Sequence, residues 1–438
     1  MSQAIKEKSS YREAFESAAR EGEPAWLARV REGALERFEE LGFPTAGEED
    51  WKYTNVAPVA RAGFRPAAGS ADSIDREVVE RFVYEEARRS RLVFVDGRLR
   101  PELSALEAVP PGVVAVGLAE ALRGEHSEII REKLEAGGGR AGSFESLNTA
   151  FTGDGAFLLV PRGVRVEAPV QLLFLSAEGD AATFPRVLVV AEPEAGLDLI
   201  ESYAAAGESS YLTDAVVEVF VGEGARVTHY KVQDESGAAF HVASTRADVG
   251  RAAAYDLTTV TLGARLSRHD IEVRLGHEGA ECRVDGLYIV GTGQHADTHS
   301  LIDHLKPHGT SRQNYKGILD GKSRAVFNGR VFVHRDAQQT DAVQSNKNLL
   351  LSAEARVDTK PQLEIFADDV KCAHGATVGQ LDEEELFYLL SRGLDPDLAR
   401  NLLTYGFAEE IVGRIKFDSI RAQLDEAILN RLHARLEV

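Results

Sequence analysis

The chain has 438 residues, with 50 lysine and arginine residues against 70 aspartate and glutamate residues, so its formal net charge is −20. This length exceeds one small domain and supports a large buried core. A negative field of this size repels phosphate backbones, so we expect no nucleic acid partner.

The start of the chain and its cysteine content bear on location. The first twenty residues mix acids and bases without an apolar run, unlike a secretory signal or a transit peptide. No stretch reaches the roughly 18 apolar residues of a membrane span. Two cysteines, Cys282 and Cys372, are too few for a disulfide framework. These features predict a soluble, cytoplasmic protein without membrane contact.

Residues 1–150 are expected to form an N-terminal helical and mixed region. Apolar residues at helical spacing between Trp26 and Phe38 predict a helix that ends near Gly42. The sequence VFVDG at residues 93–97 predicts a strand closed by a turn.

Residues 151–380 are expected to form a large β core. Short β-rich runs punctuated by glycine and aspartate extend from about Ala156 to Val370, without the pattern of a long helix. No fixed repeat of the kind that indicates a solenoid is visible. The pattern therefore leaves a β-sandwich, a β-barrel and a β-helix open, and Asn328-Gly329 between two apolar runs would by itself indicate a hairpin.

Residues 381–438 are expected to form a C-terminal helical subdomain. Asp382 is placed to cap a first helix, and Asp395-Pro396 is a typical start for a second. Apolar residues at helical spacing predict a third helix from about Ala408.

Four histidines lie within fourteen residues, at His295, His299, His304 and His308. Imidazole is a common metal ligand, so the cluster is one candidate metal site. The alternative places these histidines on the outer faces and turns of strands.

The tripeptide Cys372-Ala373-His374 is the sharper candidate for a metal site. In a strand, residues two apart project to the same face about 6.5 to 7 Å from each other. A thiolate and an imidazole at this spacing suit iron or an iron–sulfur cluster completed by a partner. The alternative is a packed thiol beside a structural histidine. Cys282, which alternates with charged residues, is expected in the core.

Motifs for independent catalysis are missing from the sequence. There is no GxxxxGK[ST] phosphate loop, GxSxG elbow or HExxH zinc motif. The acids Asp368 and Asp369 would point to opposite faces of a strand, which argues against a β-helical carbohydrate-active enzyme. We therefore expect no enzymatic turnover by this chain.

The segment from Tyr315 to Leu394, which contains NGRVFVHRDAQQTDAVQSNKNLLLS and KCAHGATVGQLDEEELFYLLSRGL, closely resembles the SufB/SufD family of iron–sulfur cluster assembly proteins. EDWKYTN at residues 49–55 and SLNTAF at residues 146–151 look like the SufD branch. Gly375 also favours that branch, since SufB members typically carry a glutamate at the corresponding place.

This resemblance implies a right-handed parallel β-helix between N-terminal and C-terminal helical parts. It implies a scaffold subunit of the SufBCD complex that pairs edge to edge with a SufB-like paralogue, or with itself when alone, and binds the SufC ABC-type ATPase. A transient Fe–S cluster would be shared with SufB at the interface, where His374 is the candidate ligand and Cys372 its neighbour. Whether a flavin binds the complex stays open.

The resemblance also places the ATPase on the C-terminal helices, which carry more apolar residues than a short cap needs. The candidate contacts, each with packing inside the helical subdomain as its alternative role, are Leu398, Leu402, Leu403, Phe407 and Ile411. The alternative function is a stand-alone metal-dependent β-fold enzyme that uses the His295–His308 cluster.

Overall fold

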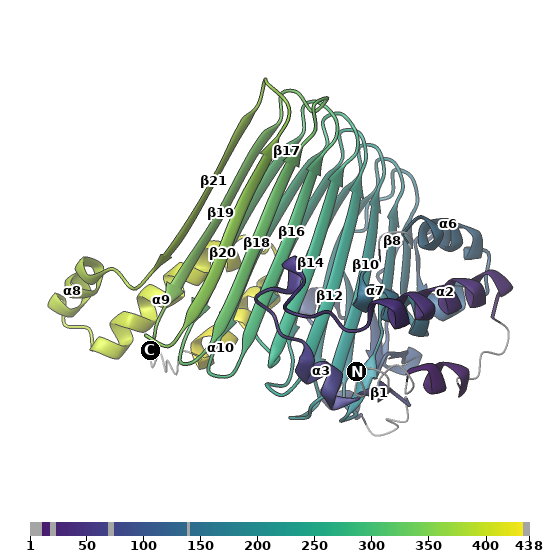
Figure 1. Ribbon diagram of the computed structural model, residues 1–438, viewed down its shortest axis with the longest axis horizontal. Helices are drawn as coiled ribbons and strands as arrows, with labels where there is room; N and C mark the ends of the chain where they lie inside the picture. Colours follow the sequence, from purple (N-terminus) through teal and green to yellow (C-terminus); the bar gives the residue numbers. More distant parts are fainter. Residues whose placement is uncertain (1–10, 18–22, 69–73, 138–140, 432–438) are drawn as a thin grey trace.

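The protein is mainly β and is built around a parallel β-solenoid of about eight turns with helical regions at its flanks. The computed structural model describes residues 11–17, 23–68, 74–137 and 141–431. Figure 1 shows the strands stacked side by side, with the N-terminal helices over one part of the stack and the C-terminal helices over another. The expected fold class is confirmed.

The strands of the solenoid alternate between two sheets, and nearly all neighbours run parallel. In spatial order the first sheet contains β20 (Arg356–Ile365), β18 (Arg324–Val333), β16 (His295–His304), β14 (Leu266–Leu275), β12 (Phe240–Val249), β10 (Leu212–Val221), β8 (Arg186–Ala191), β5 (Gly155–Val160) and β4 (Val114–Gly117). In addition, β7 (Ala181–Thr183) pairs with β10, and β1 (Arg65–Pro66) pairs with β7. The second contains β21 (Lys371–Gly379), β19 (Asp341–Leu350), β17 (Thr310–Leu319), β15 (Glu281–Val290), β13 (Ala254–Thr261), β11 (Arg226–Asp234), β9 (Gly196–Ala205), β6 (Val170–Ser176), β2 (Arg91–Val95) and β3 (Arg98–Leu99).

The two sheets enclose a continuous core formed by every second residue of each strand. The core is largely aliphatic and aromatic, but it also contains a charged cluster in which Glu201 lies 2.7 Å from His229 and 2.9 Å from Lys231. Burial opposes the charge on Glu201, yet the charges of Lys231 and His229 hold its pKa well below the usual value. The cluster is therefore a buried, internally neutralised ion network.

Asn328-Gly329 does not form the hairpin that its dipeptide pattern suggested. Both residues lie in the middle of β18, paired in parallel with β16 and β20. A β-carbon on Gly329 would lie 2.5 Å from Nε2 of Gln344 and 2.7 Å from the Phe327 ring. Glycine is needed here for close packing in the core and makes no turn.

Most of the N-terminal region lies on the outer face of the first sheet, but Val79 packs with Val93 and Leu173 of the second sheet. Its helices are α2 (Ala25–Leu41), α3 (Ala57–Ala62), α4 (Arg76–Glu80), α5 (Leu118–Ala121), α6 (Ser127–Gly137) and α7 (Ser143–Phe151). As expected, α2 ends at Gly42, whose φ is 65°, and the strand predicted at residues 93–95 is part of β2. Phe144 and Leu147 of α7 pack with Leu212 and Phe240 of the sheet.

The second and third C-terminal helices lie on the outer face of the second sheet, whereas the first packs beside the second helix and has no buried residue. Asp382 caps α8 (Glu383–Ser391) and Asp395 caps α9 (Pro396–Val412), as the sequence indicated. The third helix, α10 (Asp418–Arg431), begins ten residues later than expected, because α9 continues through Val412 before the chain turns. Among the described residues, no helix has the length and apolar character needed to cross a bilayer.

Candidate functional site

The solenoid has an uncovered end at β20 and β21. These are the last strands of the two sheets, and no strand in the described part of the chain pairs with their outer edges. Most of β21 is exposed, whereas every second residue of the preceding strand β19 is buried. Free edge strands of this length are templates for pairing with another chain, and Pro361 within β20 is typical of an edge position.

Cys372 and His374 both lie on this uncovered end. In the β19–β21 ladder, Cys372 is the register partner of Ala342 and His374 is that of Gln344. Ala342 and Gln344 point into the core and are 0% and 1% exposed. The expected common face of Cys372 and His374 is therefore the continuation of the solenoid interior, left open because no further coil follows.

The two thiols differ in how far they are withdrawn from water. Cys282 is buried in the core, and burial raises its pKa strongly. Cys372 is partly buried, and burial also raises its pKa, while a backbone hydrogen bond near Ala342 opposes the shift. Since the thiolate is the ligand form, metal binding at Cys372 must displace its proton.

The pair supplies too few donors for a complete metal centre. Across the residues that the structure describes, no group of three or more His, Cys, Asp or Glu side chains is placed to hold a metal ion. A cluster usually takes about four protein ligands. Cys372 and His374 together supply two potential metal ligands on an accessible face, about half of the number that a cluster takes.

The four clustered histidines do not converge on one point. His295 and His299 lie on the outward face of β16, while His304 faces the core and bonds Oγ of Ser311 at 2.9 Å. His308 lies in the following turn with a φ of 61°. His295 and His299 share one network through Thr54 and Asp297, whereas His304 and His308 lie apart from it. No group of three or more potential ligands forms among the described residues, so the structure gives no support to the stand-alone metal enzyme.

The segment at residues 49–55 is a tether between the N-terminal region and the first sheet. The guanidinium of Arg268 lies 3.9 Å from the centre of the Trp51 ring and ion-pairs with Asp297 at 2.7 Å. Oγ1 of Thr54 lies 2.9 Å from Nε2 of His295. This family-like motif therefore has a structural role, and it explains the position of one clustered histidine.

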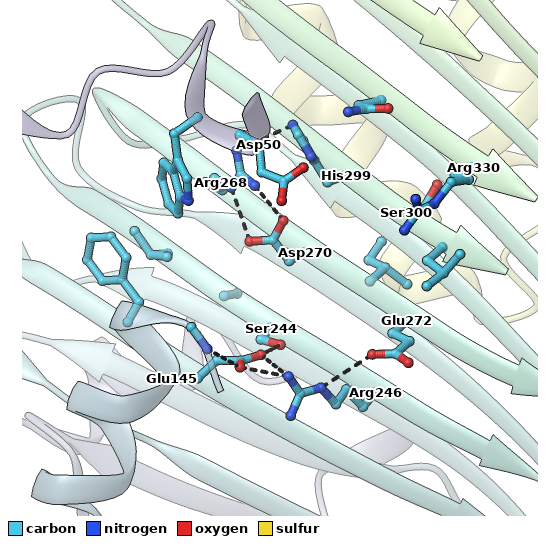
Figure 2. Close-up of a pocket in the computed structure, with 18 of the residues that line it drawn as sticks. Asp50, Glu145, Ser244, Arg246, Arg268, Asp270, Glu272, His299, Ser300 and Arg330 are labelled. Atoms are coloured by element: carbon cyan, nitrogen blue, oxygen red, sulfur yellow. Dashed lines mark hydrogen bonds and ion pairs between the residues drawn. The ribbon is translucent and has the colours of Figure 1, made fainter. Parts of the chain in front are cut away.

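A pocket of about 520 Å³ opens between this tether, the start of α7 and the first sheet (Figure 2). Its cations are each paired with a carboxylate: Arg246 with Glu145, Arg268 with Asp270, Arg330 with Glu364 and Lys360 with Glu49. These ion pairs link the N-terminal segments and neighbouring strands of the first sheet around the pocket.

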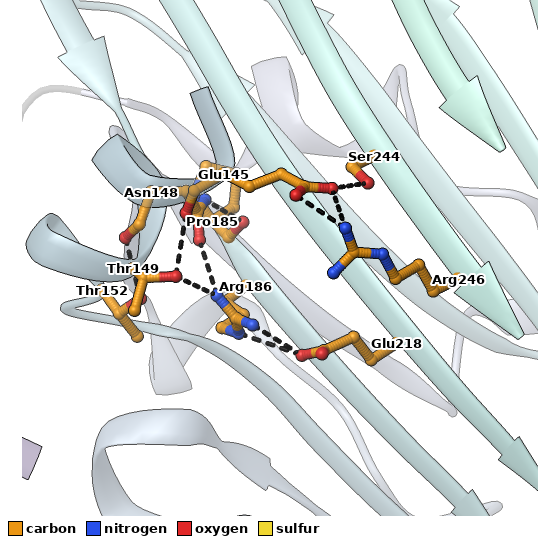
Figure 3. A network of polar contacts seen from close by, with 9 residues as sticks. All are labelled: Glu145, Asn148, Thr149, Thr152, Pro185, Arg186, Glu218, Ser244 and Arg246. Carbon is orange, nitrogen blue, oxygen red and sulfur yellow. Dashed lines mark hydrogen bonds and ion pairs between the residues drawn. The ribbon is translucent and has the colours of Figure 1, made fainter. Parts of the chain in front are cut away.

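The segment at residues 146–151 is a second structural motif, shown in Figure 3. Nδ2 of Asn148 donates to the backbone oxygens of Pro185 and Asp214, at 3.1 and 2.7 Å. Arg186 forms a buried ion pair with Glu218 at 2.7 Å and also bonds the amide oxygen of Asn148 at 3.3 Å. These contacts fix α7 on the first sheet.

The five apolar candidates on α9 divide into two groups. Leu398 and Leu402 are 36% and 42% exposed, and Leu403 is partly exposed. Phe407 packs partly against the core between the helices and the second sheet, and Ile411 is fully buried in that core. Because Ile411 is buried there, it helps to anchor α9 to the second sheet, whereas the first half of the helix is exposed.

An apolar surface that the sequence analysis missed lies on α8. This helix has no buried residue, and its Phe387, Tyr388 and Leu390 are 72%, 55% and 37% exposed. The sequence signal for this surface is LFYLL at residues 386–390, an apolar run between polar segments. We call Phe387, Tyr388, Leu390, Leu398 and Leu402 together the α8–α9 apolar surface.

The chain is similar to known proteins over more than nine-tenths of its length. Residues 5–172 match the SufBD protein N-terminal region and residues 174–407 match the SufBD core domain of the SUF system for FeS cluster assembly. An iron–sulfur cluster assembly SufBD family protein of Synechocystis is 37% identical, over 93% of this chain and 91% of the relative. SufD of Escherichia coli is 31% identical, over 91% of each chain, and SufB of Bacillus subtilis is 26% identical, over 88% of this chain and 85% of the relative.

Proposed function

The chain belongs to the SufB/SufD family of iron–sulfur cluster assembly proteins and is a homologue of SufD, and we propose that it is the SufD-type scaffold subunit of a SufBCD complex. The observation that carries this proposal is the uncovered end of the solenoid, where Cys372 and His374 lie on the interior face of the last coil, which no further coil covers. The subunit supplies ligands and structure and has no enzymatic turnover of its own.

The partner at the uncovered end is a SufB-like paralogue. The unpaired edges of β20 and β21 offer main-chain groups for strand pairing. A paralogue that pairs there brings its own side chains over the open face, next to His374. The assembled interface then completes the ligand set for a transient Fe–S cluster. In the absence of the paralogue, a second copy of this chain fits the same edges.

The ATPase partner, of the SufC type, binds the α8–α9 apolar surface. Large apolar side chains are exposed on two helices that contact each other, and exposed apolar surface of this kind is typical of protein interfaces. The complex works in the reducing cytoplasm, which is consistent with two free thiols, Cys282 and Cys372.

Replacement of His374 tests the ligand role. We expect His374→Ala, co-expressed with the SufB-like and SufC-like partners, to lower the iron and sulfide content of the purified complex several-fold while leaving subunit association and melting temperature unchanged. Cys372→Ala is expected to have a smaller effect, because Cys372 also packs against the core. His308→Ala is the matched control, since His308 lies in a turn and its side chain is 54% exposed. Full cluster content in the His374 variant would disprove the ligand role.

A further inference from the structure

A row of hydrogen-bonded side chains crosses the solenoid interior beneath the uncovered end. Nε2 of Gln313 donates to Oγ of Ser300 at 2.8 Å, and Nε2 of Gln344 donates to Oε1 of Gln313 at 2.7 Å. All three residues are buried. With its amide nitrogen bonded to Gln313, the Gln344 amide directs Oε1 away from that bond.

This orientation leaves one acceptor of Gln344 unused. Its Oε1 is buried and has no hydrogen-bond partner among the described residues. A buried acceptor without a donor is costly, so most such atoms in native proteins are satisfied. The unsatisfied oxygen leaves Gln344 able to accept a hydrogen bond from a donor on its open side.

The next residue along this column is His374. Gln344 and His374 are register partners in the β19–β21 ladder, so their side chains leave the same face of neighbouring strands about 4.8 Å apart. The register partner of Cys372 is Ala342, whose methyl side chain cannot form a hydrogen bond. Of Cys372 and His374, it is therefore His374 that has a polar side chain as its register partner.

The opposite sheet encloses Gln344 without giving it a donor. The close approach of Gly329 to the Gln344 amide leaves no room for a β-carbon. One coil further out, Pro361 is the register partner of Gly329 and has neither a side-chain donor nor a backbone N–H. Of the two outermost register neighbours, His374 beside Gln344 and Pro361 beside Gly329, His374 is thus the one with a donor group.

We propose that Gln344 is a positioning residue for His374: its Oε1 accepts a hydrogen bond from one ring N–H and leaves the other ring nitrogen to bind iron. The inference rests on the proposed ligand role of His374. In a neutral imidazole one nitrogen carries the proton and the other the lone pair, and the hydrogen bond selects which. Such outer partners orient metal-bound histidines and typically contribute 10- to 100-fold to metal affinity.

The test compares two buried amides on the same strand and the same face. Gln344→Leu removes the acceptor below His374, whereas Asn348→Leu removes a buried amide whose register partner is Val378. In the co-expressed complex labelled with ¹⁵N-histidine, we expect Gln344→Leu to lower cluster content about tenfold and to weaken the histidine nitrogen coupling seen by pulsed EPR. Asn348→Leu should leave both within twofold of the parent. Equal results for the two variants would overturn the inference.

A second pair of variants keeps the test decisive if either leucine variant fails to assemble. Gln313→Glu, which stays protonated at this buried position, retains an oxygen that accepts from Nε2 of Gln344 and an O–H that donates to Ser300, so the amide orientation and the cluster should be kept. Gln313→Leu releases the Gln344 amide, and cluster content should fall. Equal content in these two variants would also count against the inference.

The His374→Ala variant separates failure of this inference from failure of the proposed function. If His374→Ala keeps its cluster, the proposed function itself fails. If His374→Ala loses the cluster while Gln344→Leu behaves as Asn348→Leu, only the positioning role fails.

Discussion

The ammonium group of Lys316 on β17 lies 4.3 Å from the centre of the Phe407 ring on α9 and donates to the backbone oxygen of Phe407 at 2.9 Å. Lys316 also forms an ion pair with Glu410 at 2.5 Å, and its side chain is only 4% exposed. Arg414, further along, pairs with the buried Asp285 of β15 at 2.8 Å. These contacts fasten the second half of α9 to the solenoid and leave its first half and α8 exposed.

We expect Lys316→Met to loosen α9 and α10 from the sheet. The variant loses a buried charged donor, which costs about 1–3 kcal/mol, while Glu410 can still be hydrated because its side chain is 42% exposed. Hydrogen exchange should become faster over residues 396–431. Lys416→Met is the control, since Lys416 pairs with Asp198 but is half exposed, and exposed pairs contribute about 0–1 kcal/mol. Equal exchange in the two variants would show that the Lys316 contact does not anchor the helix.

Stability is expected to fall as the pH decreases from about 6.5 to 4, in part because of His304. Burial lowers the pKa of His304 to about 4, against 6.5 for the exposed group. Between these values the unfolded chain binds a proton that the folded chain does not, so protonation favours unfolding. A difference of about 2.5 pH units corresponds to about 3 kcal/mol.

The variant His304→Gln isolates this contribution. A glutamine amide can bond Ser311, as Nε2 of His304 does, but it does not titrate. In urea titrations, the parent should lose more stability than the variant between pH 7 and pH 4.5. The same loss in both proteins would contradict the prediction and assign the pH dependence to other groups, such as His241 and His269, whose pKa values burial also lowers.

A methyl group at Gly329 is expected to destabilise the fold by about 1–3 kcal/mol, the usual cost of overpacking. Its β-carbon would come within 2.5 Å of the Gln344 amide and within 2.7 Å of Phe327. Gly375→Ala is the matched control, because nothing lies within 4 Å of a β-carbon at Gly375 on β21. Thermal melting should fall clearly for Gly329→Ala and little for Gly375→Ala; no drop at Gly329 would mean that the core adjusts.

The sequence predicts the order of helical, β and helical parts, but its residue pattern does not indicate a solenoid. Paired strand starts of the first sheet fall 28, 26, 29, 29 and 32 residues apart, at Leu212, Phe240, Leu266, His295, Arg324 and Arg356. Turns of different length change the spacing from coil to coil, so no fixed repeat is visible. The resemblance to a family was needed to select the β-helix.

For the candidate site, strand periodicity correctly places Cys372 and His374 on one face. The pattern of i and i+2 cannot show which side of a strand faces the core or that the last coil is uncovered, because both depend on pairing between distant segments. It also cannot separate Ile411 from Leu402: both have helical spacing, and only the packing of α9 on the second sheet buries Ile411. Gln344 carried no signal in the sequence for the same reason.

The last prediction concerns the α8–α9 apolar surface. A charge placed at the centre of a partner interface must be desolvated without a counter-charge, and central apolar contacts commonly account for 2 kcal/mol or more of binding. We expect Leu402→Glu to weaken binding of the SufC-type ATPase at least tenfold by calorimetry, and Phe387→Glu to do the same. Leu41→Glu is the control: Leu41 and Leu402 are both 42% exposed, but Leu41 ends α2 in the N-terminal region. Since the substituted side chains are exposed, all three variants should fold and melt as the parent does. Unchanged ATPase affinity in Leu402→Glu and Phe387→Glu would move the docking site away from α8 and α9.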